Sequence, residues 1–408
     1  MLEVRRAHHK SRRILATILS VIVLGVIVTG IAWLNNSNSP IPTKKTVATT
    51  TVKVPQPTAI YSNLLFMGNT FWGRYMNDWS MASPLKTAYP FSRLNEFHRD
   101  QYNAWITGLE CPTVEGVTMT SLQMDTLLQF NCPPEYLPEA AKWFTAFTLA
   151  NNHTDNQGVD GFKETKQSLD KNGIQYFGHY DPRELNDLCD VISLPVTVTN
   201  DDTSISKGRL PVAMCGYHGV FRIPLPDSVA VMKKYSTLMP VIAMPHMGAE
   251  YQPAADQIKT DFYRSLIDGG ADMVLGDHPH WIQNTESYKG HLIVYSMGNF
   301  MFDQQTTQEV TRSAAIQVVI ASNGGNKDMI KKWLALGETC STYHDTCLAD
   351  ATSEGLTKLD LTFQFGVVGT NDADKITKPA TAAQQVGILQ RLNWNATMSK
   401  LHAPYSKL

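Results

Sequence analysis

The 408-residue chain has little net charge, no repeat period and no C-x-x-C pair. A formal charge of −2, with no basic block beyond residues 1–13, gives no support for nucleic-acid binding. The absence of C-x-x-C spacing excludes a zinc ribbon, and the absence of a repeat period excludes a solenoid. The composition is 43% hydrophobic, which is enough for one large or two medium domains with a real core.

One long apolar run stands near the N-terminus, at residues 14–34. It is long enough to cross a bilayer, and its basic flank at 1–13 predicts a transmembrane anchor with a cytoplasmic N-terminus. A cleaved signal peptide is the alternative, but the run is long for one and no clean A-x-A site follows. Residues 35–58, rich in Ser, Thr, Pro, Lys and Asn, predict an extended linker, and residues 59–408 an extracytoplasmic domain.

The six cysteines are an even number, and outside the cytoplasm disulfides persist. Several connectivities are possible. We expect at least a bridge from Cys340, because a short polar loop follows it. Pairing of sequence neighbours would join Cys111 to Cys132, Cys189 to Cys215, and Cys340 to Cys347.

Short apolar runs alternate with helical patterns over most of the chain, which predicts an α/β fold. In strand–helix–strand order the strands are parallel, and their carboxyl ends share one edge of a sheet. The last third of the chain predicts an antiparallel edge of the same domain, with a polar, irregular segment between its two strands. The predicted strands include 64–67, 103–107, 146–150, 174–177, 210–216, 314–321 and 359–368, and the predicted helices are 159–172, 254–268 and 380–392.

Histidines follow neighbouring apolar runs in the stretch from Met239 to Phe300. One run leads into His246, the next into His278 and His280, and a third into Asn299. Because ligands bind at the carboxyl edge of parallel strands, and neutral imidazole is a good transition-metal ligand, this pattern predicts a metal site. A lone H-x-H pair is more often a surface feature, so the prediction depends on the position after buried strands.

Two further strand ends carry polar residues. Asn151-Asn152-His153 is typical of a turn, in which asparagine is common. In the functional interpretation, an asparagine side-chain oxygen binds a metal and His153 donates a proton or a hydrogen bond nearby. Glu110 is otherwise a solvated carboxylate. His179 and His218 are interpreted as hydrogen-bonded structural histidines.

Six motifs, read together, carry a resemblance to a known family. They resemble the ordered motif set of the bacterial CapA family, which comprises capsule biosynthesis proteins associated with poly-γ-glutamate synthesis. The resemblance implies a metallophosphoesterase-like α/β sandwich with mixed, largely parallel sheets, often tethered to the membrane. The motifs span residues 63–304 and read GNTFWGR, GLECP, LANNHTDNQGVDGFKET, MPHMGAEY, GADMVLGDHPHWIQ and IVYSMGNFMFDQ.

The resemblance also implies a site for one or two divalent ions of manganese, zinc or iron. His153 is implied as a phosphoesterase-style proton donor. Residues implied to support the ligands or to face the substrate are Arg74, Asn151, Glu250, Asn299 and Asp303. The implied metal ligands are Asn69, Glu110, Asn152, His246, His278 and His280.

One position departs from the family pattern. The family has Gly-Asp at the first strand, whereas this chain has Gly68-Asn69. An aspartate there bridges two ions, and an amide oxygen carries no charge to offset them. A mononuclear or weakly binding site is therefore as well supported as a dinuclear one. Asp277 could supply a carboxylate nearby.

Three functions follow from the resemblance. The first is a membrane-anchored role in biosynthesis, export or retention of an anionic capsular polymer of the poly-γ-glutamate type, with membrane-bound polymer ligase subunits as partners. The second is a metal-dependent hydrolase of phosphoesters or of the polymer's amide bonds. The third is a polymer-binding module whose metal site has decayed, which Asn69 favours.

Overall fold

The structure is a computed structural model that describes residues 54–322 and 325–408. The predicted tail at 1–13, the anchor at 14–34 and most of the predicted linker lie outside the described residues. Within those residues, no helix combines the length and apolar character needed to cross a bilayer. Residues 55–408 form one compact unit.

The sheet is organised around β1 (Pro57–Thr70). Its first half pairs antiparallel with two strands, and its second half runs parallel to two others, with a register shift before Asn69. β1 therefore delivers Asn69 to the point where two branches of the sheet meet. The antiparallel partners are β5 (Cys189–Asn200) and β12 (Arg312–Ser322), and the parallel partners are β2 (Ala104–Leu109) and β11 (Asn299–Met301).

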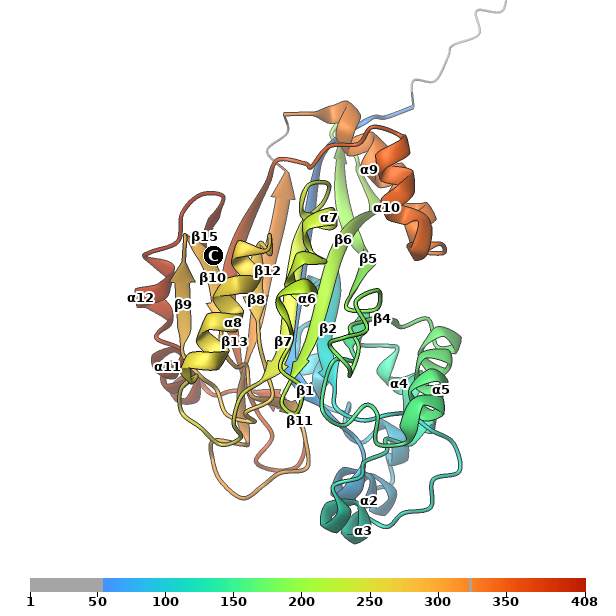
Figure 1. Cartoon of the computed structure of the whole chain (residues 1–408), viewed down its shortest axis with the longest axis vertical. Helices are drawn as coiled ribbons and strands as arrows, with labels where there is room; N and C mark the ends of the chain where they lie inside the picture. Colours follow the sequence, from blue (N-terminus) through green and yellow to red (C-terminus); the bar gives the residue numbers. More distant parts are fainter. Residues whose placement is uncertain (1–53, 323–324) are drawn as a thin grey trace, which may run out of the picture. The chain divides into compact units, whose positions relative to one another are not determined.

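One branch continues from β2 through β3 (Ala146–Thr148) to β4 (Gln175–Phe177), all parallel. The crossover between β3 and β4 is α5 (Gly158–Lys171), which packs at the outer side of this branch in Figure 1. Both strands and the helix were predicted from their patterns. The confirmed crossover places Asn152 at the carboxyl end of β3.

The other branch runs from β5 and β6 (Ile205–Gly219) into a parallel series. α8 (Gln257–Asp268) is the crossover between the strands that carry the histidines, as predicted. It begins later than predicted because the Asp256 carboxylate accepts the Lys259 backbone N–H, at 2.8 Å, and so caps the helix there. The series is β7 (Val241–Met247), β8 (Met273–Leu275) and β10 (His291–Val294), with β9 (Thr285–Tyr288) antiparallel at the edge and α6 (Pro226–Ala230) and α7 (Lys233–Ser236) before β7.

The last third adds β13 (Leu361–Asn371), antiparallel to β12, as predicted. The segment between them was predicted only as a polar excursion, but it forms two helices, α9 (Lys327–Cys340) and α10 (His344–Ser353). α9 buries Ile330, Trp333 and Leu336 on one face at helical spacing, a pattern that the prediction missed. The remaining elements here are β14 (Lys378–Pro379), β15 (Tyr405–Lys407), α11 (Ala382–Arg391) and α12 (Trp394–Met398).

Short elements lie in the segments before and after β2 and β3. Of these, α2 and α3 lie side by side at the lower right of Figure 1. None was predicted, because each is too short to show a hydrophobic period. They are α2 (Arg74–Ala82), α3 (Ser121–Leu127), α4 (Leu137–Ala140) and the 3₁₀ turns η1 (Lys86–Ala88), η2 (Leu94–Phe97), η3 (Arg99–Gln101) and η4 (Pro134–Tyr136).

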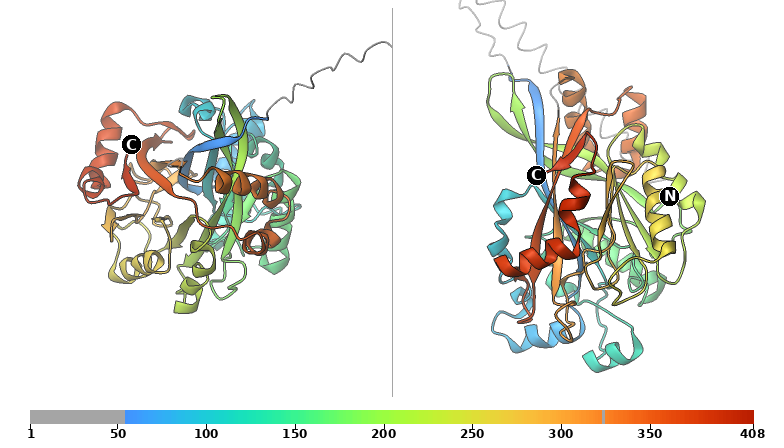
Figure 2. Two further views of the ribbon diagram at one scale, coloured as in Figure 1. Left: turned by 90° about the horizontal axis from the view of Figure 1, so that it is seen from above. Right: turned by 90° about the vertical axis from the view of Figure 1, so that its left-hand side faces the viewer.

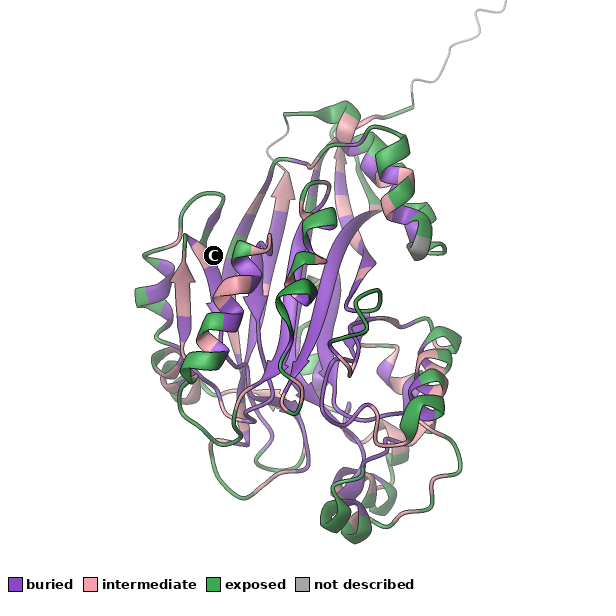
Figure 3. Cartoon of the chain, viewed as in Figure 1, coloured by how far each residue is buried: buried purple, intermediate pink, exposed green. Residues whose placement is uncertain are grey.

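The strands are buried along most of their length, and the helices expose their outer faces (Figure 3). Strands covered on both faces read as continuous apolar runs, which is why they were visible in the sequence. Seen from two further directions, the helices still lie outside the strands (Figure 2).

All three neighbour pairings of cysteines are formed. Cys189 and Cys215 face each other across the β5–β6 ladder. The third bridge joins the end of α9 to α10. The first lies beside the site described next.

Candidate metal centre

The predicted ligands come together from five separate parts of the chain. Glu110 follows β2, Asn152 follows β3, and His278 follows β8. His246 is the penultimate residue of β7, not a residue past its end, and Asn299 begins β11, so the expected placement after the strands was wrong for these two. The edge is the one predicted, because parallel strands bring their carboxyl ends together.

His246 has one nitrogen bonded to protein and the other turned to the site. Nδ1 lies 2.8 Å from Asp277 Oδ1, so an N–H there donates to the carboxylate. Nε2 then carries a lone pair, 2.8 Å from Asn152 Oδ1 and 3.1 Å from His278 Nδ1. Burial lowers the pKa of His246 and of His278 well below the ordinary value, so both rings are neutral.

This group of acceptors fits a divalent ion. Glu110 Oε1 is 4.0 Å from His246 Nε2, and Glu110 Oε2 is buried without a hydrogen-bond partner. One ligand atom each from Glu110, His246 and His278 lie within 4.8 Å of one another. Asn152 Oδ1 and His246 Nε2 are both acceptors, and facing lone pairs repel unless a cation lies between them. Carboxylate, amide and imidazole are ligands for zinc, manganese or iron. We call Glu110, Asn152, His246 and His278 the His246 side.

Asp277, which the predicted ligand set omitted, lies behind His246. Its carboxylate points inward to His246, and its Oδ2 is buried with no hydrogen-bond partner. Only glycine leaves room for it at position 108, because a Cβ there would lie 2.7 Å from Oδ2. Burial raises the pKa of Asp277 to about 7. A carboxylate behind a histidine orients the ring and strengthens it as a ligand.

In the other half of the centre, amide side chains support the histidine. We call Asn69, His280 and Glu250 the His280 side. Asn299 Oδ1 lies 2.8 Å from His280 Nδ1 and accepts the Asn69 amide N–H at 3.1 Å. His280 Nε2 then faces two carboxylates, Glu110 at 3.9 Å and Glu250 at 3.8 Å. Burial lowers the pKa of His280 to about 4.

The backbone that carries His278 and His280 is held in an unusual conformation. Their φ angles are +89° and +60°, in the left-handed region that non-glycine residues rarely adopt. Each such residue costs roughly 1–3 kcal/mol and persists only where surrounding contacts fix it. The Pro279 carbonyl between them accepts the Tyr251 backbone N–H at 2.9 Å. The two imidazoles are therefore fixed by tertiary contacts.

His153 lines the cleft outside the centre. Its Nδ1 lies 2.9 Å from Asn156 Oδ1, and the Phe130 backbone N–H donates to the same oxygen at 2.7 Å. His153 Nδ1 therefore carries a proton, and Nε2 is an acceptor. Burial lowers the pKa of His153 to about 4, so it is neutral near pH 7 and must take up a proton before it can donate one. Its catalytic role stays a prediction.

Arg74 and Asp303 form a buried pair with both guanidinium edges engaged. Arg74 Nε and Nη2 donate to the two Asp303 oxygens at 3.0 and 2.6 Å, and Nη1 donates to Asp125 at 3.1 Å. Asn151 likewise bonds within the protein, because its amide donates to the Leu109 carbonyl at 2.6 Å. These three predicted residues support the walls of the site.

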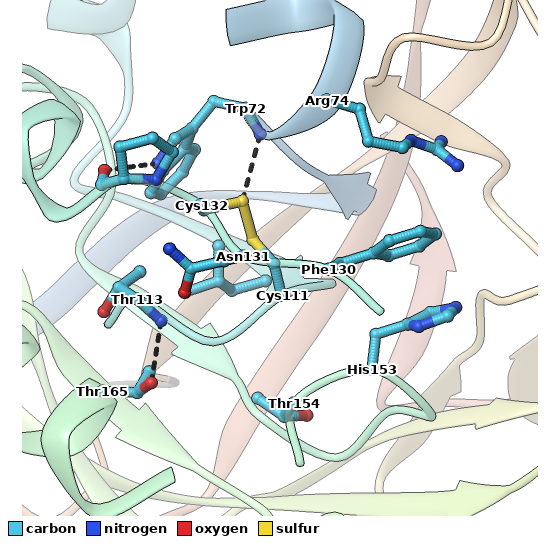
Figure 4. Close-up of a disulfide and its surroundings, with 12 residues drawn as sticks. Trp72, Arg74, Cys111, Thr113, Phe130, Asn131, Cys132, His153, Thr154 and Thr165 are labelled. Carbon is cyan, nitrogen blue, oxygen red and sulfur yellow. Dashed lines mark hydrogen bonds between the residues drawn. A yellow bond between two sulfur atoms is a disulfide. The ribbon is translucent and has the colours of Figure 1, made fainter. Parts of the chain in front are cut away.

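The Cys111–Cys132 bridge ties two parts of the site together (Figure 4). Cys111 directly follows Glu110, and Cys132 is two residues from Phe130. The Phe130 ring lies between His153, at 3.9 Å between ring centroids, and the Arg74 guanidinium, at 4.3 Å. The disulfide thus fixes Glu110 relative to the cleft wall.

A cleft of 470 Å³ opens over the His280 side. Four carboxylates line it, and Arg74 is the one arginine or lysine among the described lining residues. The lining includes Glu110, Asp125, Glu250, Asp303, Arg74, His153, Tyr251 and His280.

The family is decided by comparison with known proteins. A model of the family described as "Bacterial capsule synthesis protein PGA_cap" matches residues 63–194 and 227–304, more than half of the chain. The chain belongs to this family. The matched residues include every predicted ligand.

Two curated relatives are capsule proteins of this family. The PGA biosynthesis protein CapA of Bacillus subtilis (strain 168) is 31% identical over 191 residues, 44% of this chain and 48% of that protein. The capsule biosynthesis protein CapA of Bacillus anthracis is 29% identical over 192 residues, 44% and 45% of the two chains. The matches span less than half of either relative. A solved structure from Thermus thermophilus, at TM-score 0.34 and 10% identity over 62% of this chain and 93% of that one, is too distant to support an argument.

Proposed function

We propose that this PGA_cap protein is a membrane-tethered, extracytoplasmic component in the biosynthesis, export or retention of an anionic capsular polymer of the poly-γ-glutamate type. Membership of a capsule synthesis family is the observation that carries the proposal. The apolar run at 14–34 supports the tether, and the three disulfides suit a compartment in which disulfides persist. Membrane-bound polymer ligase subunits are the expected partners.

The charge of the cleft indicates how such a polymer would be held. Glu250 and Asp125 stand at its walls, while Arg74 is already paired with Asp303. These carboxylates repel a polyanion. Of the His246 side, Glu110 and Asn152 line the cleft, and a divalent cation held by the acceptors of this side would offset the charge. We therefore propose that polymer carboxylates approach the metal centre and not an arginine pocket.

Deletion of the gene tests this function. We expect surface polymer to fall after deletion, to return with the full wild-type chain, and not to return with His246→Ala. His402→Ala, which changes an exposed histidine, should restore polymer fully. Unchanged surface polymer after deletion would contradict the proposal.

A second candidate function is hydrolysis of a phosphoester or of the polymer's amide bonds, on a fold of the metallophosphoesterase type. The observation in its favour is the acceptor cluster of Glu110, His246 and His278, because its Glu110 lines the same cleft as His153. A divalent ion held by Glu110, Asn152, His246 and His278 would supply Lewis-acid catalysis. His153, with Nε2 as an acceptor, would take a proton in the reaction and return it to the leaving group.

Metal content and turnover of the purified full-length protein separate hydrolysis from a scaffold or binding role. We expect a bound divalent ion and cleavage of a generic phosphodiester or a γ-glutamyl amide, both lost in His278→Ala and kept in His402→Ala. A metal-free protein without turnover would leave a polymer-binding role.

A further inference from the structure

Two large apolar side chains that line the cleft are exposed to solvent. Phe221 is 76% exposed and Leu128 is 61% exposed, and both belong to the lining of the cleft that Glu110 and His153 share. Phe221 lies in the loop after β6, and Leu128 lies at the end of α3. A single exposed apolar residue is common, but two that line one cleft indicate a surface that a ligand covers.

The backbone of Leu128 has a conformation that favours glycine. Leu128 caps the carboxyl end of α3 with φ +51° and ψ +36°, in the left-handed region. Glycine is the usual residue at such a helix end, because a Cβ makes this conformation costly. A leucine here lowers stability and also exposes its own side chain. Strain of this kind is found where a functional contact requires the residue.

The loop that carries Phe221 is anchored through its neighbours. The Arg222 guanidinium lies 3.8 Å from the Asp155 carboxylate and 3.9 Å from that of Asp181. The Phe221 backbone N–H donates to His218 Nε2 at 3.5 Å. These contacts hold the main chain of the loop while the Phe221 ring stays exposed, so the ring is available to a ligand in the cleft.

The charges that line the cleft do not supply affinity for a polyanion. Glu250 and Asp125 are partly exposed there and repel carboxylates. Arg74 already donates to acidic side chains of the protein. A γ-linked glutamate chain also carries methylene groups in its main chain, and apolar side chains attract these groups whatever the charge around them.

We propose that Phe221 and Leu128 form an apolar lip of the cleft that binds the methylene groups in the main chain of an anionic polymer. The ligand class is a polyanion with an aliphatic main chain. The apolar lip distinguishes polymers of equal charge by the number of methylene groups that they carry. This inference rests on the polymer-related function proposed above.

Two polymers that differ by one methylene group in each residue test the apolar lip. γ-Linked oligoglutamate and β-linked oligoaspartate of the same length carry the same charge, but the aspartate main chain is shorter by that group. Fluorescence anisotropy of labelled oligomers with the full-length protein, in the presence of Mn²⁺, gives both affinities. We expect the wild type to prefer oligoglutamate by about 4-fold or more, which is the effect of burying one methylene group.

Two variants should remove this preference. Phe221→Ser and Leu128→Gly each delete one side of the apolar lip, and each should bring the two affinities to within about 2-fold of each other. Leu128→Gly should also keep the melting temperature within about 3 °C of wild type, because the relief of left-handed strain offsets the lost contacts. Weaker binding at unchanged stability separates a binding role from a structural one.

The same helix and the same loop supply matched controls. Leu122 on α3 is 67% exposed and Ile223 after β6 is 59% exposed, and neither is among the described residues that line the cleft. Leu122→Ser and Ile223→Ser should therefore keep the preference of the wild type. Loss of the preference in these two controls would overturn the inference, because selection would then not depend on the cleft.

The remaining outcomes distinguish the inference from the proposed function. Equal affinity of the wild type for the two oligomers, or a preference that survives in Phe221→Ser and Leu128→Gly, would overturn the apolar lip and leave polymer binding in place. Absence of binding of either oligomer to a folded wild type would count against both proposals.

Discussion

The two imidazoles that face Glu110 are held from behind by different groups. His246 donates to the carboxylate of Asp277, whereas His280 bonds to the amide of Asn299. A carboxylate increases the basicity of the ring and adds negative charge near a cation, and an amide only orients the ring. The comparison predicts that the His246 side binds a divalent ion more tightly than the His280 side, and we call the ion on the His246 side the tight ion.

The largest effect is expected from His246→Ala, which removes the ligand in contact with most of the His246 side. Metal affinity should fall by more than about 100-fold. Loss of a residue that only hydrogen-bonds to a ligand costs roughly 10–100-fold, and loss of the ligand itself should cost more. His280→Ala should leave the tight ion within a few-fold of wild type. Calorimetry on both variants measures the difference. Equal losses of affinity would show that the two histidines contribute alike to the tight ion.

Removal of the Cys111–Cys132 bridge affects the ligand common to both halves. The double variant Cys111→Ser/Cys132→Ser frees a loop of 21 residues and should lower the free energy of unfolding by about 3 kcal/mol. It should also weaken metal binding, because Glu110 precedes Cys111. Denaturant unfolding and calorimetry are the measurements.

The matching control removes the remote bridge, with Cys340→Ser/Cys347→Ser. That variant should lose stability without any change in metal affinity. If both double variants bind metal as the wild type does, the disulfide has no role in placing Glu110.

The supporting groups can be compared directly. Asp277→Asn should reduce affinity for the tight ion by about 10–100-fold, since the amide no longer supplies charge behind His246. Asn299→Ala should change the tight ion by less than about 3-fold, because Asn299 supports only the other ring. Equal effects of the two variants on the tight ion would show that charge behind the ring is unimportant.

The smallest effect concerns Lys259, a buried lysine near Asp277. Burial lowers the pKa of Lys259 from 10.5 to about 7, and its ammonium donates to Gln283 at 3.0 Å. Above pH 7 the unfolded chain therefore binds more protons than the folded one, so stability from this residue rises with pH. Between pH 7 and 8.5 the wild type should gain about 1–2 kcal/mol relative to Lys259→Met.

Urea unfolding of both proteins at the two pH values, in the presence of a chelator, checks this gain. Identical pH dependence would show that Lys259 keeps an ordinary pKa. Lys259→Arg serves as a second variant, because its charge does not titrate in this range.

The crossover helices and most of the buried strands were predicted correctly, but β5 was not. α5 and α8 show their period clearly, and β2 and β3 are short continuous apolar runs. α9 was missed although Ile330, Trp333 and Leu336 stand at helical spacing, because the polar, Gly- and Cys-containing composition of the segment was interpreted as irregular. Elements of three or four residues, such as η2, leave no periodic signal.

Most residues of the candidate site were predicted from the sequence, but the hydrogen bonds that join them were not. Asn152, His246 and His278 meet as expected, yet nothing local indicates that Asp277 turns inward behind His246. Arg74 was predicted to support the ligands or face the substrate; its bond to Asp303, 229 residues away, decides that it supports the wall. Such contacts depend on the sheet bringing distant loops together.

The order of residues alone determined the α/β class, the parallel crossovers and the ligand types, because hydrophobic period and residue chemistry are local properties. Only the tertiary structure decided how charge is distributed between the two histidines. That distribution depends on which carboxylate, amide or lysine packs behind each ring, and β1, β7 and β11 set that packing from positions more than 50 residues apart.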